Sequence, residues 1–107
     1  MRHDPALVAE TRGWFVKAAR DIAAARFELT AEPPFLEDIA FHAQHAIEKA
    51  VKGFLCWHGQ VFRKTHNLVE LGQAAAAIET RLEPLLRQAA PLRSLIDINL
   101  PTSSLGV

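Results

Sequence analysis

The chain has 107 residues, of which 50% are hydrophobic and 22% charged, a composition that excludes a disordered or fibrous protein and fits one domain. Twelve basic and twelve acidic residues balance, which argues against a duplex-DNA binder because such proteins need a surplus of Lys and Arg. The single Cys56 cannot form an internal disulfide, no apolar leader follows Met1, and no uncharged stretch reaches the roughly 18 residues of a membrane helix. We therefore expect a cytoplasmic protein with no membrane contact.

The composition favours helices, because Ala (18 residues) and Leu (13 residues) are abundant and Tyr is absent. A first helix is predicted from Asp4 to Leu29, with Asp4 as N-cap and Pro5 in the first helical position. Pro33 and Pro34 exclude its continuation. Its expected inward face repeats every three or four residues and consists of Leu7, Thr11, Trp14, Phe15, Ala18, Ala19, Ile22, Ala25 and Leu29.

A second long helix is predicted from Phe35 to His58, ending before Gly59. The short Pro-Pro connection makes it antiparallel to the first helix, and the many alanines allow the two backbones to approach closely. Its expected apolar stripe is Ile39, Ala40, Ala43, Ala46, Ile47, Ala50, Val51, Phe54 and Leu55.

Two shorter helices are expected to follow. The third runs from Leu68 to Ile78 with Asn67 as its cap, and the fourth starts near Glu83 and Pro84. Pro91 predicts a kink or break in the fourth helix, and the tail after about residue 101 is expected to be loose. Residues 1–107 are thus read as one all-α domain.

Basic residues gather after the middle of the chain. Between Lys49 and His66 there are four basic residues (Lys49, Lys52, Arg63 and Lys64) and no acid. Arg63, Lys64 and His66 are expected to converge on the start of the third helix, where free N–H groups and the helix dipole favour a phosphate. Thr65 and Asn67 belong to the same candidate phosphate site, or simply cap the helix, and Lys49 and Lys52 could reach it from the second helix. Solvated surface charge is the alternative interpretation.

A family resemblance rests on two runs, Phe41-His42-Ala43-Gln44-His45-Ala46-Ile47-Glu48-Lys49-Ala50-Val51-Lys52 and Lys64-Thr65-His66-Asn67-Leu68. Together they resemble the HEPN domain ("higher eukaryotes and prokaryotes nucleotide-binding"). Trp14, Lys17, Ala18 and the Asp21-Ile22 pair resemble the opening pattern of that family, and Leu100-Pro101-Thr102 resembles the start of its closing segment.

The resemblance implies an up-and-down bundle of four to five helices that forms a homodimer. It also implies nucleotide or RNA binding and association with a minimal nucleotidyltransferase, as in toxin–antitoxin pairs. Some relatives are metal-independent ribonuclease toxins with an Arg and a His further apart than Arg63 and His66, which only Lys64 and Thr65 separate. The Arg-Tyr-Pro ending common in the family is replaced by Ser103-Ser104-Leu105.

Polar residues on the second helix suggest metal binding as an alternative to phosphate binding. His42 and His45 lie three residues apart, with Asp38 and Glu48 one turn away on either side, and imidazoles with a carboxylate can hold a metal. Two histidines three residues apart are common in proteins that bind no metal at that position, so we expect no metal and no cofactor. Instead, His42, Gln44 and His45 are expected at a polar edge or a dimer interface, with Glu48 paired to Lys52 along the helix.

Three functions remain open from the sequence. The first is a nucleotide- or RNA-phosphate-binding and interaction module that partners a nucleotidyltransferase. The second is a ribonuclease toxin in which Arg63 and His66 are catalytic in an altered geometry. The third is a structural dimer without a ligand. No glycine-rich phosphate loop or other enzyme signature is present.

Overall fold

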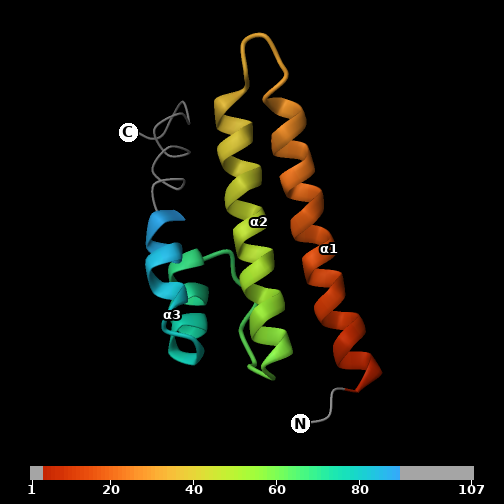
Figure 1. The fold of residues 1–107 in the computed structure, drawn as a ribbon, viewed down its shortest axis with the longest axis vertical. Helices are drawn as coiled ribbons and strands as arrows, with labels where there is room; N and C mark the ends of the chain where they lie inside the picture. The colour runs from red at the N-terminus through yellow and green to blue at the C-terminus, as the bar shows by residue number, and fades with distance from the viewer. Residues whose placement is uncertain (1–3, 90–107) are drawn as a thin grey trace.

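The computed structural model describes residues 4–89, and this part of the chain is helical and contains no strand. α1 spans Pro5–Glu28, α2 spans Leu36–Trp57 and α3 spans Leu68–Ile78, and a further helical segment covers residues 82–89. Figure 1 shows α1 and α2 side by side as a long hairpin, with α3 and the segment 82–89 on the other side of α2. The predicted all-α fold with two long antiparallel helices is confirmed.

The helices end where local signals in the sequence place them. The Asp4 carboxylate accepts a hydrogen bond from the Leu7 amide (2.8 Å), and Pro5 occupies the first turn of α1. At the end of α2, Gly59 has a φ of +69°, and the amides of Gly59 and Gln60 donate to the carbonyls of Cys56 and Leu55. This left-handed glycine turn satisfies carbonyls that the helix leaves open, so α2 stops one residue before the predicted His58.

The contact between α1 and α2 is antiparallel and closely packed. Thr11 donates to the Cys56 sulfur (3.3 Å), while further along α1 Asp21 pairs with Lys49 (2.6 Å). Gly53 lies directly against α1, since a Cβ atom built there would be 3.1 Å from atoms of Phe15 and Trp14. The predicted close approach of the two backbones is therefore present, and at Gly53 a missing side chain permits it.

The hydrophobic core lies on the opposite side of α2. Val51 and Leu55 from α2 are buried against Leu71 and Ala75 from α3, and Leu55 is completely inaccessible (0%). Partly buried residues complete this core: Ile47, Phe54, Phe62, Leu68, Ala74, Ile78, Leu82 and Leu86. α2 is thus covered on two sides, by α1 and by α3, which decides where its polar residues lie.

Part of the predicted inward face of α1 is not buried. Phe15 and Ile22 each leave 45% of their surface exposed, and Leu29 is also exposed. The reason is that α2 is the only helix of the described residues that packs against α1, so the covered stripe is narrow and includes Thr11 and Ala18. Phe62 of the loop adds an edge-on contact with the Trp14 ring. None of the helices in residues 4–89 combines the length and the apolar character needed to cross a bilayer.

Several sequence features lie outside the described residues. The fourth helix begins at residue 82, close to the predicted Glu83, but the expected kink at Pro91 falls beyond residue 89. The same holds for the tail after about residue 101, including Leu100-Pro101-Thr102 and Ser103-Ser104-Leu105.

Candidate functional site

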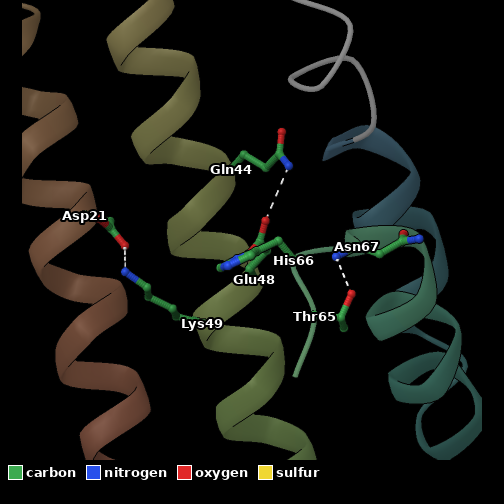
Figure 2. Close-up of polar contacts among 7 residues, drawn as sticks. All are labelled: Asp21, Gln44, Glu48, Lys49, Thr65, His66 and Asn67. Carbon is green, nitrogen blue, oxygen red and sulfur yellow. Dashed lines mark hydrogen bonds and ion pairs between the residues drawn. The ribbon is translucent and has the colours of Figure 1, made fainter. Parts of the chain in front are cut away.

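The segment before α3 is fixed by the two residues that flank His66. Thr65 accepts a hydrogen bond from the Asn67 amide (3.0 Å), and Asn67 in turn accepts one from the Glu70 amide (3.1 Å). The predicted capping role of Asn67 is confirmed, and Thr65 holds the backbone that leads into it. Because both neighbours bind backbone groups, the His66 side chain is left to turn toward α2, as Figure 2 shows.

His66 meets a buried carboxylate on α2. Its Nδ1 atom lies 3.1 Å from Oε1 of Glu48, whose side chain is only 2% exposed, whereas that of His66 is 77% exposed. The second carboxylate oxygen of Glu48 accepts a longer hydrogen bond from the Gln44 amide nitrogen (3.4 Å; Figure 2). Since an ionised carboxylate can only accept, Nδ1 of His66 donates in this contact, and Nε2 takes no part in it.

Arg63 does not join His66, contrary to the expected convergence. Its guanidinium binds both carboxylate oxygens of Glu70 in the first turn of α3 (2.8 Å each). The hydrogen bond and charge of Arg63 lower the pKa of Glu70, and Glu70 raises the pKa of Arg63. Arg63, which was predicted to bind a phosphate, is therefore paired with Glu70 in the first turn of α3.

The two α2 lysines face the other helix. Lys49 binds Asp21 of α1, as Figure 2 shows, and Lys52 is buried with its ammonium 5.3 Å from the centre of the Trp14 ring. The expectation that both could reach the phosphate site is wrong for these conformations, because their positions on α2 point them into the contact with α1. For the same reason Lys52 does not pair with Glu48, although their spacing predicts such a pair.

Lys64 is the remaining basic candidate beside His66. It is exposed, and within residues 4–89 it has no ion pair. The basic loop does not line the cavity of about 640 Å³ that lies between α3 and the segment 82–89. That cavity is walled by Leu68, Gly72 and Leu86, with Gln44 from α2. A ligand at Lys64 and His66 would thus bind at the surface.

The histidines of α2 have different partners. Nδ1 of His42 pairs with Glu28 at the end of α1 (2.9 Å), so it lies at the hairpin contact. The ring of His45 stacks at a tilt on Phe41 (4.2 Å between centroids) and lies 5.6 Å from the ring of His66. His45, Glu48 and His66 each place a ligand-type atom within 4.8 Å of the others.

The family model of the HEPN domain matches residues 11–97, which include α2, the capped loop and α3. The chain belongs to the HEPN domain family. No curated protein and no solved structure matches it significantly. The resemblance read from the two sequence runs is therefore confirmed.

Glu48 is the residue of this HEPN domain whose burial and contact with His66 were not predicted from the sequence. The spacing predicts it on a polar face with Gln44, yet both are buried, and Gln44 Oε1 has no hydrogen-bond partner within the described residues. The available signal is the helical register, because Gln44 and Glu48 fall on the same side of α2 as Val51 and Leu55, which form the core. Nothing in the sequence indicates that a residue 18 positions later meets them.

Proposed function

We propose that this HEPN domain is a nucleotide- or RNA-phosphate-binding and interaction module of the cytoplasm that acts as a homodimer with a separately encoded minimal nucleotidyltransferase. The observation that carries the phosphate contact is the arrangement of His66, whose Nδ1 is held by buried Glu48 while the ring is otherwise exposed. Membership of the HEPN family supports the nucleotide and the partner.

The chemistry of the contact follows from this arrangement. The contact at Nδ1 leaves Nε2 of this exposed ring as a donor to a phosphate oxygen whenever the imidazole is protonated. Lys64 adds a second cation two residues earlier, with no acid bound to it in the described part of the chain. The proposed phosphate site is therefore His66 with Lys64, positioned by Thr65 and Asn67, and excludes Lys49, Lys52 and Arg63.

The test is a titration of a labelled single-stranded RNA, and of ATP, in buffer with EDTA. We expect His66→Ala and Lys64→Ala each to weaken binding about tenfold, as for a lost hydrogen bond to a charged group. Lys64→Ala should also reduce the salt dependence by about one phosphate contact. Arg87→Ala is the matched control, since Arg87 is exposed and pairs with Glu83 away from the loop. Equal binding by all four proteins would remove the phosphate site.

The partner surfaces proposed here are apolar. Phe27 (76% exposed), Leu29, Phe35 and Leu36 gather around the turn of the α1–α2 hairpin, and Phe41 is exposed one turn further along α2. Such a patch is costly in water and typical of an interaction surface. Sedimentation at micromolar concentration tests the homodimer, with Phe27→Ser together with Leu36→Ser as the disrupting variant, and a monomeric wild-type protein would contradict it. Co-purification with the product of the adjacent gene tests the nucleotidyltransferase.

A second candidate function is favoured by the contact between Glu48 and His66. An imidazole oriented by a carboxylate through Nδ1 can act as a general base or acid at Nε2, which is what a metal-independent ribonuclease requires. Arg63 is held by Glu70 and is a poor catalytic partner in this conformation. The test incubates RNA in EDTA with the wild type and with His66→Ala. Cleavage that is lost in the variant supports a ribonuclease. Equal cleavage by both proteins, or no cleavage, excludes this function. No binding and no cleavage would leave the structural dimer.

A further inference from the structure

Three metal-ligating side chains meet where the loop before α3 crosses α2. His45 and Glu48 are three residues apart on α2, so they lie on one side of the helix, and His66 approaches them from the loop. One donor atom from each lies within 4.8 Å of the others. This grouping goes beyond the phosphate contact, because it includes His45, and because the nitrogen of His66 that faces Glu48 is Nδ1 rather than Nε2.

The charge of the cluster is not balanced by a fixed cation. Glu48 is 2% exposed, and burying an ionised carboxylate is costly unless a cation or several donors accompany it. Within residues 4–89 its partners are the amide of Gln44, at a long 3.4 Å, and the ring of His66. Lys52, one turn further along α2, points at Trp14 instead. A divalent ion would supply the missing charge.

The side chains around the cluster hold the ligands in place. Gln44 binds Oε2 of Glu48 and so orients the carboxylate with Oε1 toward His66, and the ring of Phe41 packs on His45. Supporting contacts of this kind commonly fix metal ligands. His66 is the adjustable member, because its side chain is 77% exposed, and a rotation of its ring can close the cluster to the separation of about 3.3 Å found between ligands of a tetrahedral ion.

We propose that His45, Glu48 and His66 form a binding site for a divalent transition-metal ion of the Zn²⁺ type. Two imidazole nitrogens and one carboxylate oxygen are a ligand set that Zn²⁺ takes in proteins, with the fourth position left for water or another ligand. The ion takes the place of the proton on Nδ1 of His66. From a neutral ring this proton moves to Nε2, and from a protonated ring the second proton is released to solvent. Nε2 of His66 is not one of the proposed ligand atoms, and metal and phosphate binding can therefore be measured separately.

The test uses Co²⁺ as a spectroscopic probe, followed by displacement with Zn²⁺, on the full chain without nucleotide. We expect one Co²⁺ per chain with visible absorption of a low-coordinate site, and a melting temperature that rises with Zn²⁺. His45→Ala and His66→Ala should each lower the affinity at least tenfold. His58→Ala is the matched control, because His58 is an exposed histidine at the end of α2 that contacts Phe54 outside the cluster, and it should bind as the wild type does.

Two results would overturn the proposal. One is a wild type that shows neither Co²⁺ absorption nor a Zn²⁺-dependent rise in melting temperature. The other is binding that survives in both His45→Ala and His66→Ala, which would place the ion elsewhere. Since the RNA titration is performed in EDTA and the metal titration without RNA, the metal site and the phosphate site can each fail without the other.

Discussion

The two mid-helix glycines of the hairpin should respond in opposite ways to the same substitution. A Cβ atom added at Gly13 in α1 would have no neighbour within 4 Å, so Gly13→Ala keeps the gain in helix propensity of about 1 kcal/mol. At Gly53 in α2 the same methyl group would be 3.1 Å from Cε2 and Cζ of Phe15 and from Cβ of Trp14. Carbon atoms prefer a separation of about 3.5–4.0 Å, so something must move.

The expected loss of stability in Gly53→Ala comes from the contact with Trp14. The Phe15 ring is partly exposed and can swing away, but Cβ of Trp14 is fixed to the α1 backbone, so the two helices must separate. Overpacking of this kind costs about 1–3 kcal/mol, which offsets or exceeds the propensity gain of about 1 kcal/mol. We therefore expect Gly53→Ala to be about 1–3 kcal/mol less stable than Gly13→Ala.

Thermal unfolding followed by circular dichroism measures this difference. For a domain of this size, 1 kcal/mol corresponds to roughly 4–8 °C in melting temperature, so Gly53→Ala should melt at least ~4 °C below Gly13→Ala. Urea unfolding provides a second measure of the same free energy. If Gly53→Ala proved as stable as Gly13→Ala or more so, the close packing of α1 on α2 at this point would be wrong.

Three further perturbations address the core, the cap and the surface charge. Leu55→Ala should lower the free energy of unfolding in urea by about 2–5 kcal/mol, because the side chain is fully buried, and a loss below about 1 kcal/mol would contradict its central position. Asn67→Ala should cost about 1 kcal/mol through the lost cap, whereas Asn67→Asp, which keeps the acceptor, should cost less; equal losses would show that the cap is not responsible. Arg63→Gln should raise the pKa of Glu70 in an NMR titration, since the guanidinium lowers it. Because the folded pKa is the lower one, the ion pair stabilises the protein above the unfolded pKa of Glu70 and this contribution is lost as the pH falls through the folded value. An unchanged Glu70 titration in the variant would contradict the ion pair.

The ends of the helices are predictable because short-range chemistry sets them. Asn67 marks the start of α3 and Gly59 the end of α2, and each acts on backbone groups within five residues. α3 accordingly spans the predicted Leu68–Ile78. The family can also be read from the sequence, because its two runs of residues lie on α2 and in the loop before α3.

The directions of the polar side chains are not predictable, because they depend on which sides of α2 are covered. A single periodic stripe describes a helix with one buried face, whereas α2 is covered by α1 and α3. The clustering of basic residues along the sequence therefore suggests that Lys49 and Lys52 reach the loop, although they lie toward α1. The polar character of Glu48 suggests a polar face, although its carboxylate is buried under His66. Arg63 is misplaced for a related reason, since its partner Glu70 is seven residues away across a turn whose shape the sequence does not specify.

The one thiol of the chain is enclosed where α1 and α2 touch, with the Thr11 hydroxyl donating to it. A water-borne alkylating reagent can reach Cys56 only during moments when the hairpin parts. The rate of Cys56 labelling therefore depends on how often the hairpin opens. When the hairpin closes faster than the thiol is alkylated, this rate is proportional to the equilibrium population of the open state. Cys56 thus reports the transient opening of the α1–α2 hairpin without any engineered label. A bound partner that holds the two helices together would slow the alkylation of Cys56.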